Sequence, residues 1–178
     1  MKVNVRRVKW LRFAIFIVAS TGIFWHLLPD AFELPPALLV PRPISPRYFA
    51  RDATTLRLML DETGQRSAPE VAWHELPKAL IDATIAVEDQ RFFQHGGIDY
   101  FAIGRAISQN ARAGRTISGA STLPQQLIKI SAPKTSRTLW RKFVEAQQAR
   151  LLVRKWPRTR ILATWLNRVS FGNLLIGC

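Results

Sequence analysis

The chain has 178 residues, enough for one domain and a short appended segment, because compact domains cluster at about 100–150 residues. Its apolar fraction of 48% excludes the low-hydrophobicity composition that keeps chains disordered. The single cysteine, Cys178, excludes an intrachain disulfide and a four-thiolate zinc site. The three histidines are scattered and lack the spacing that is typical of a metal cluster.

The formal net charge is +14, and the excess of basic residues lies at the two ends of the chain. Residues 1–12 hold five basic side chains and no acidic one, whereas residues 101–178 hold fourteen basic side chains and one acidic one, Glu145. Such a distribution indicates a polyanion or an anionic membrane as partner. Nucleic acid is one such polyanion, but no recognisable nucleic-acid-binding motif accompanies the charge, so we expect no nucleic-acid partner.

Residues 13–28 form an uncharged apolar segment directly after the basic residues 1–12. About 20 apolar residues cross a bilayer, and Trp10 and Trp25 extend this segment into the interfaces where tryptophan is favoured. The preceding basic residues predict a single-pass anchor with a cytoplasmic N-terminus and an extracytoplasmic body. A cleaved signal peptide and a buried core helix are the alternatives; we favour an uncleaved anchor because no clear cleavage site follows.

Residues 29–47 hold six of the eleven prolines, so we expect an extended, semi-rigid linker there. The folded body is expected over residues 48–178. Within it, residues 54–60 and 66–73 flank the sequence DETGQ, which indicates a small β-hairpin around an acidic turn.

The pattern becomes helical after residue 77. One helix opens at Pro77 and nears its end at Glu88, and a second covers 100–113, with Asp99 as its N-cap and Gly114 as its C-cap. Three more are predicted from the capping box of Thr122 and Gln125, from Ser136 or Thr138 to about Trp156, and over 158–167. These patterns predict a mainly α domain with a small β element.

Glu88 and Asp89 stand near the end of an otherwise apolar helix. Adjacent acidic residues usually form a solvated helix end. Alternatively, Val87 and the following phenylalanines, Phe92 and Phe93, partly desolvate Glu88, as suits a general base. The spacing does not choose between these interpretations.

Glu145 follows Arg141 by four residues and Lys142 by three. This spacing is typical of an ordinary ion pair on one helix face. A carboxylate among cations also suits a site for an anionic diphosphate leaving group. The segment 119–129 places hydroxyls, amides and Lys129 at a helix start, which suits an anion or sugar site, or is only a well-capped amphipathic helix.

Taken in order, these segments resemble the motifs of the family 51 glycosyltransferases, the peptidoglycan polymerases found as monofunctional enzymes and as the N-terminal module of class A penicillin-binding proteins. EDQRFFQHGG at 88–97 resembles ED-x-x-F-x-x-H-x-G, and GASTLPQQLIK at 119–129 resembles G-x-S-T-x-T-Q-Q-x-x-K. RKFVEAQQA at 141–149 resembles R-K-x-x-E, and RTRILATWLNRVSFGN at 158–173 resembles the fourth motif.

The resemblance implies a lysozyme-like, mainly α fold that polymerises lipid II, a disaccharide-pentapeptide joined through diphosphate to a polyprenol, into β-1,4-linked glycan. Glu88 would be the general base, and Glu145 would assist at the donor site. The resemblance further implies substrate-binding roles for Asp89, His95, Ser121, Thr122, Gln125, Gln126, Lys129, Arg141 and Lys142.

The family's usual topology implies a body on the periplasmic side of the bacterial inner membrane. Its partners would be lipid II, the growing glycan strand, the membrane and, in some members, a transpeptidase. Some members use a divalent cation, Mg²⁺ or Mn²⁺.

The chain departs from the family pattern at three positions. Pro124 replaces a threonine of the second motif, Ala163 stands where glutamate is common in the fourth, and Val153 where an acid is common near the end of the third. Family members also continue beyond the FGN turn with further helices, so the resemblance implies a domain that is incomplete at its C-terminus. A truncated relative that binds lipid II or glycan without polymerising it is therefore the alternative to an active polymerase.

Overall fold

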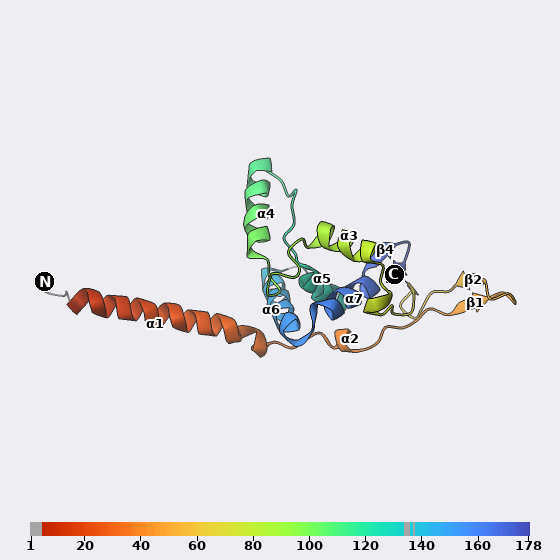
Figure 1. The fold of residues 1–178 in the computed structure, drawn as a ribbon, viewed down its shortest axis with the longest axis horizontal. Coiled ribbons are helices and arrows are strands. Elements are labelled where there is room, and N and C mark those ends of the chain that lie inside the picture. Colours follow the sequence, from red (N-terminus) through yellow and green to blue (C-terminus); the bar gives the residue numbers. More distant parts are fainter. Residues whose placement is uncertain (1–4, 134–135, 137) are drawn as a thin grey trace.

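The structure, a computed structural model, describes residues 5–133, 136 and 138–178, and for residues 5–9, 11 and 12 it describes the backbone alone. The described chain is mainly helical and carries two small sheets, which confirms the predicted fold class (Figure 1).

Helix α1 (Val5–Leu27) projects away from the body (Figure 1). The window Phe13–Ala31 has a mean hydropathy of 1.5 and is long and apolar enough to cross a membrane. Only 6% of it is buried against the rest of the molecule. The alternative of a buried core helix is therefore wrong.

The junction between α1 and the body is held by two arginines of α6 (Leu139–Lys155). Arg150 donates to the Trp25 carbonyl over 2.7 Å, and its guanidinium lies 4.4 Å from the centroid of the Trp25 ring. Arg154 donates to the His26 carbonyl and pairs with Asp30 over 3.0 Å. Cations at the last carbonyls of a helix are favourable because those groups carry partial negative charge.

The segment after α1 differs from the extended spacer that its prolines predict. It forms a short 3-10 helix, η1 (Leu28–Ala31), and a helical turn, α2 (Pro36–Leu39). Leu38 is buried in the core, and Arg168 donates to the carbonyls of Ala37 and Val40 over 2.6 and 2.9 Å. Apolar residues between the prolines therefore draw this segment onto the body.

The small hairpin uses other strands than predicted. Strand β1 (Arg47–Phe49) pairs antiparallel with β2 (Thr55–Leu58). Strand β3 (Arg66–Ser67) runs parallel to β5 (Leu175–Ile176), which pairs antiparallel with β4 (Ser170–Gly172). The prediction that residues 54–60 pair with 66–73 is therefore wrong. Each of the two strands pairs with a different segment, β2 with β1 and β3 with β5.

The helices follow the predicted boundaries closely. A short 3-10 turn, η2 (Trp73–Glu75), precedes α3 (Lys78–Glu88), and α4 (Tyr100–Ala113) begins at its N-cap Asp99, whose carboxylate accepts from the amides of Phe101 and Ala102. In α5 (Leu123–Ser131) Thr122 and Gln125 form the capping box, and α6 begins after Thr138. The last helix is α7 (Arg158–Arg168).

The core lies between α5, α6 and α7, with the turn after α3 packed onto it. Phe92, in that turn, is fully buried. The core residues on the three helices are Leu123, Leu127, Ile128, Ala149, Leu152, Ile161, Leu162, Ala163, Trp165 and Leu166. This packing brings the end of α3 to the start of α5, where two of the sequence motifs meet.

Candidate active site

The end of α3 borders an open cleft of about 520 Å³, here called the Glu88 cleft. Its walls are residues 87–91, the first turns of α4, and the loop residues 117–122. Glu88 is exposed at this cleft, and Val87 keeps 81% of its surface exposed. The expectation that Val87 and the phenylalanines partly desolvate Glu88 is therefore wrong: only Phe92 is buried, and Phe93 is 56% exposed.

The Glu88 carboxylate is oriented by the second motif. Gln126, on α5, donates from Nε2 to Glu88 Oε2 over 2.9 Å, and the two residues are 38 positions apart in the sequence. Gln126 is half-buried on α5, next to the fully buried Leu127. The fold thus brings the first two motifs into direct contact.

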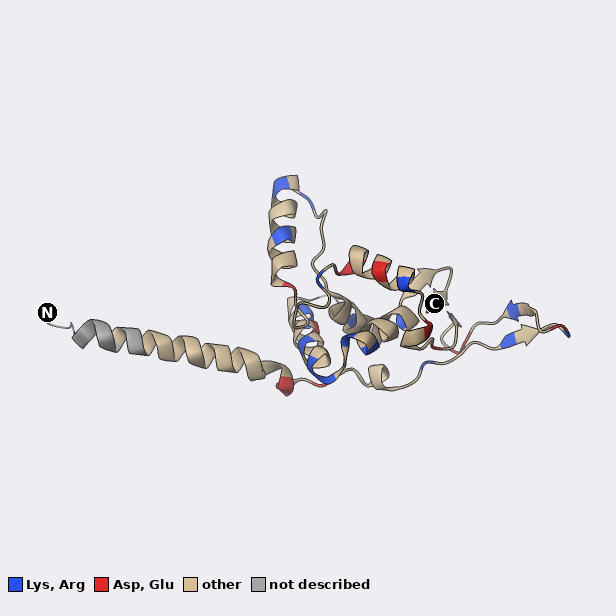
Figure 2. Cartoon of the chain, viewed as in Figure 1, with Lys and Arg blue, Asp and Glu red and all other residues tan. Residues whose placement is uncertain are grey.

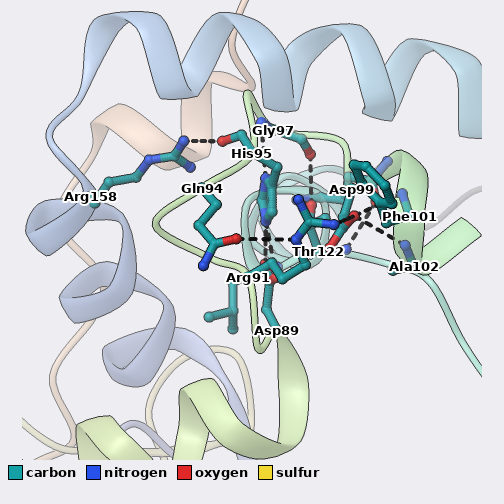
Figure 3. A network of polar contacts seen from close by, with 12 residues as sticks. Asp89, Arg91, Gln94, His95, Gly97, Asp99, Phe101, Ala102, Thr122 and Arg158 are labelled. Atoms are coloured by element: carbon teal, nitrogen blue, oxygen red, sulfur yellow. Dashed lines mark hydrogen bonds and ion pairs between the residues drawn. The ribbon is translucent and has the colours of Figure 1, made fainter.

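Unlike Glu88, Asp89 has a buried side chain, and it faces His95 (Figure 3). Both of its carboxylate oxygens lie 2.9 Å from His95 Nε2, and Oδ2 also accepts from the Leu123 amide over 2.9 Å. The Gly97 amide donates to His95 Nδ1 over 3.2 Å, so the ring proton must sit on Nε2 and point at Asp89. Asp89 therefore joins the end of α3 to the start of α5.

Two further contacts complete this buried network (Figure 3). Thr122 donates from Oγ1 to the Gly97 carbonyl over 2.7 Å. Arg158, the first residue of α7, donates to the His95 carbonyl and lies 5.5 Å from the centroid of the Phe92 ring. The first, second and fourth motifs therefore meet in one network behind the Glu88 cleft.

Gly97 is required where it stands. Its φ of +101° is a conformation that side chains with a Cβ rarely adopt, and a Cβ there would lie 2.7 Å from the Ala149 carbonyl oxygen. The turn between α3 and α4 thus packs its backbone directly against α6.

Glu145 borders a second cleft of about 530 Å³, the Glu145 cleft, which lies between α6 and the chain that follows α1. Its side chain is 18% exposed and accepts from Arg141 Nε over 3.2 Å. Arg141 also donates to the Pro133 carbonyl over 2.9 Å. The Trp140 ring lines the same cleft and stacks on Phe143 with a centroid distance of 5.5 Å.

The remaining predicted site residues lie in the loop before α5 and on α5 and α6. Ser121 is exposed in the Glu88 cleft, while Gln125 accepts from the Thr122 amide as part of the cap. Lys129 is exposed at a third hollow beside residues 168–174, and Lys142 is exposed on α6 outside both named clefts. The predicted residues thus do not share a single pocket.

Lys and Arg are most concentrated on α6 and α7, although other basic residues lie on α4 and on the β1–β2 hairpin (Figure 2). Burial lowers the pKa of the Arg158 guanidinium from its ordinary value, and the charge of Asp89 acts in the opposite direction. One of its terminal nitrogens, Nη1, is buried without a hydrogen-bond partner.

The three departures from the family pattern lie away from the Glu88 cleft. Pro124 is fully buried, so its ring packs in the core. Val153 packs against the same core, and Ala163 borders a hollow beside Trp156 and Trp73. None of the three residues lines the Glu88 cleft.

A divalent cation held by the protein alone does not fit the residues present. Within the described part of the chain, no three His, Cys, Asp or Glu side chains gather as a metal ligand set. Glu145, the carboxylate expected at the donor site, is paired with Arg141. We therefore derive no step through a metal.

Sequence reasoning missed two residues that shape the site. Arg158 is a cation at the start of α7, although the positive end of the helix dipole favours an anion there. A cation at this unfavourable position indicates that the side chain has a role other than stabilising the helix. Asn110 lies in the last turn of α4, and its side chain binds the backbone of residues 117 and 118. No local sequence pattern indicates these bonds, because they join residues seven and eight positions apart.

Several known proteins are similar to this chain in sequence. The transglycosylase family model matches residues 48–178. Penicillin-binding protein 1B of Vibrio cholerae is 45% identical over 98 residues, 55% of this chain and 13% of that protein. The biosynthetic peptidoglycan transglycosylase of Stutzerimonas stutzeri is 44% identical over 105 residues, 59% of this chain and 43% of that protein. Penicillin-binding protein 1A of Streptococcus oralis is 34% identical over 164 residues, 90% of this chain and 25% of that protein.

The chain spans less than half the length of each of these three relatives. The family match itself covers well over half of the chain and includes the Glu88 cleft and the network behind it. The chain therefore belongs to the transglycosylase family, the family 51 glycosyltransferases of peptidoglycan synthesis.

Proposed function

We propose that this chain polymerises lipid II into β-1,4-linked glycan strands and releases polyprenyl diphosphate, with Glu88 as the general base. The observation that carries the proposal is the Glu88 carboxylate, which is exposed at an open cleft and held by Gln126 over 2.9 Å. A general base must be within reach of the proton it removes, and a fixed, accessible carboxylate meets that need.

In the proposed reaction, Glu88 takes the proton from the 4-hydroxyl of the acceptor. The hydroxyl oxygen forms a bond to the anomeric carbon of the donor as the bond from that carbon to the diphosphate breaks on the opposite face. The diphosphate leaves with the bonding electron pair. Attack from the opposite face inverts the configuration and makes the β link.

We divide the other cleft residues by their exposure. Ser121 lines the cleft and Gln126 holds the Glu88 carboxylate, and both are proposed to contact sugar hydroxyls or the acceptor. Asp89, His95 and Thr122 are buried, so we assign them the positioning of Glu88 and of the start of α5. Their support acts through the hydrogen bonds described above.

The donor diphosphate is proposed to lie toward α6. Glu145 orients Arg141 through their ion pair, and cations at this end of the body offset the charge of the leaving diphosphate. Lys129 and Lys142 are exposed and are proposed to join them. The concentration of basic residues on α6 supports this placement (Figure 2).

We further propose that α1 anchors the body on the periplasmic side of the inner membrane. The five basic residues among residues 1–12 favour a cytoplasmic N-terminus. The basic body would then face anionic headgroups and diphosphate lipids. A transpeptidase partner is proposed from the family resemblance alone.

The test is polymerisation of lipid II by the detergent-purified chain with its N-terminal segment kept. Wild type is compared with Glu88→Gln, Glu145→Gln and the control Asp82→Asn, an exposed acid on the same helix as Glu88. We expect glycan strands from wild type and from the control, and none above background from Glu88→Gln.

Two outcomes would overturn parts of the proposal. A Glu88→Gln variant as active as wild type rejects Glu88 as the base. Saturable lipid II binding by a folded wild type that makes no glycan replaces the polymerase with the binding-only alternative.

A further inference from the structure

The loop over residues 114–121 leaves the far end of α4 and returns toward the start of α5 (Figure 1). Residues 117–121 form one wall of the Glu88 cleft, which Glu88 borders from the end of α3. The loop itself has little packing. Ile117 is 54% exposed, and a Cβ added at Gly119 would meet nothing within 4 Å.

Asn110 holds the middle of this loop with its side-chain amide. Its Oδ1 accepts from the amides of Ile117 and Ser118 over 2.8 and 2.9 Å. Its Nδ2 donates to the Ser118 carbonyl over 3.0 Å. In the described part of the chain, no other hydrogen bond ties residues 115–121 to the rest of the molecule.

The two ends of the loop are fixed separately. Gly114 ends α4 in the left-handed conformation, with a φ of 63°. Thr122 is bound to the Gly97 carbonyl over 2.7 Å. Between these points, a segment without packing would sample many conformations if the Asn110 contacts were lost.

We propose that Asn110 is a positioning residue that keeps residues 117–121 as a preformed wall of the Glu88 cleft. A ligand that enters the cleft then does not have to order the loop, which lowers the free-energy cost of binding. The proposal rests on the proposed function for the identity of that ligand, lipid II. Asn110 touches no substrate in this account; it acts through the loop.

We call the three hydrogen bonds from Asn110 to the loop the Asn110 clamp. If the clamp preforms the cleft wall, its loss should change lipid II binding more than turnover. Asn110→Ala removes all three hydrogen bonds, so we expect the Kd and KM for lipid II to rise about tenfold, with kcat within about twofold of wild type. Asn110→Asp keeps the two accepted bonds and loses the donated one, so we expect a smaller rise of about threefold. Gln109→Ala, at the exposed neighbouring position on α4, serves as the matched control.

The experiment measures direct binding of lipid II to the detergent-purified full chain, together with steady-state polymerisation, for wild type and the three variants. A raised Kd for Asn110→Ala, a smaller rise for Asn110→Asp and no change for Gln109→Ala support the clamp. A wild-type Kd for Asn110→Ala overturns it. So does a loss confined to the amount of lipid bound at unchanged Kd, because that pattern reports only fewer folded molecules.

The binding arm separates this proposal from the proposed function. A raised Kd for Asn110→Ala in a protein that makes no glycan supports the clamp and overturns the polymerase. If wild type makes glycan and Asn110→Ala binds lipid II with an unchanged Kd, the polymerase is supported and the clamp is overturned. A wild type that does not bind lipid II overturns both.

Discussion

The Glu88 cleft and the Glu145 cleft each contain one of the two carboxylates predicted to be catalytic, but these two carboxylates are held in different ways. Glu88 contacts Gln126, 38 positions away, and its neighbour Asp89 anchors a buried network. Glu145 pairs with Arg141, four positions earlier on its own helix. The first site depends on tertiary contacts and the second mainly on local helix geometry. Changes around the first should therefore have larger effects.

The largest expected effect tests the chemistry at the first cleft. Glu88→Gln removes a general base, so we expect kcat for lipid II to fall about 10²–10⁴-fold. Because Glu88 is exposed, the midpoint of thermal unfolding should not move. Steady-state kinetics and a melting curve on the same sample measure both. A larger loss of kcat in Glu145→Gln than in Glu88→Gln would contradict the expectation that changes at the Glu88 cleft have the larger effect.

The next effect tests the buried support of that cleft. Asp89→Asn turns an amide group toward the His95 N–H or the Leu123 N–H, so one buried donor loses its acceptor. We expect the free energy of unfolding to fall by about 2–3 kcal/mol. Urea unfolding measures it, with Asp82→Asn as the exposed control that should stay within about 0.5 kcal/mol of wild type. Equal losses in the two variants would show that the buried network adds no more to the free energy of unfolding than an exposed carboxylate does.

A matched pair of glycines tests the packing of the same turn on α6. Gly97→Ala places a Cβ 2.7 Å from the Ala149 carbonyl oxygen at a φ of +101°, so we expect a loss of about 2 kcal/mol. Gly96→Ala meets nothing within 4 Å and should change stability by less than about 0.5 kcal/mol. Urea unfolding of both variants measures the difference. Equal stability of the two would contradict the close approach.

The second cleft should tolerate the loss of its ion pair. Arg141→Gln breaks a partly exposed pair on one helix, so we expect the free energy of unfolding to fall by about 1 kcal/mol or less. The same variant should raise KM for lipid II if Arg141 offsets the donor diphosphate. Unfolding and kinetics together measure the two effects. A loss of stability as large as that of Asp89→Asn would remove the contrast between the clefts.

The smallest effect comes from a carboxylate outside both clefts. Desolvation raises the pKa of Asp61, but hydrogen bonds from Ser67, Thr63 and Gln65 outweigh it and hold the pKa well below its usual range. Its contribution to stability is therefore fully present above the ordinary carboxyl pKa of about 3.9 and is lost as the pH falls through the folded-state pKa. Melting curves from about pH 6 to about pH 3 should show a smaller acid loss in Asp61→Asn than in wild type. An identical loss in both would assign the acid sensitivity elsewhere.

Local patterns in the sequence determined the helices and the family. Asp99 and Thr122 cap the helices they were predicted to cap, and Gly114 ends α4. Of the two predicted caps for α6, Ser136 and Thr138, the helix uses Thr138. These features depend on hydrogen bonds between residues two to four positions apart, which a sequence displays directly. The four motifs, likewise read in order along the chain, were sufficient for the family assignment.

Only the tertiary structure decided which of two adjacent acids is exposed, and which strands pair. Glu88 and Asp89 look alike in sequence, yet the backbone leaves the helix at Asp89 and turns that side chain toward His95 and α5. Strand β3 pairs with β5 near the C-terminus because hydrogen-bond partners in a sheet need no proximity in sequence. The contacts of Gln126, Arg158 and the loop bound by Asn110 have the same origin: each joins segments that only the packed core brings together.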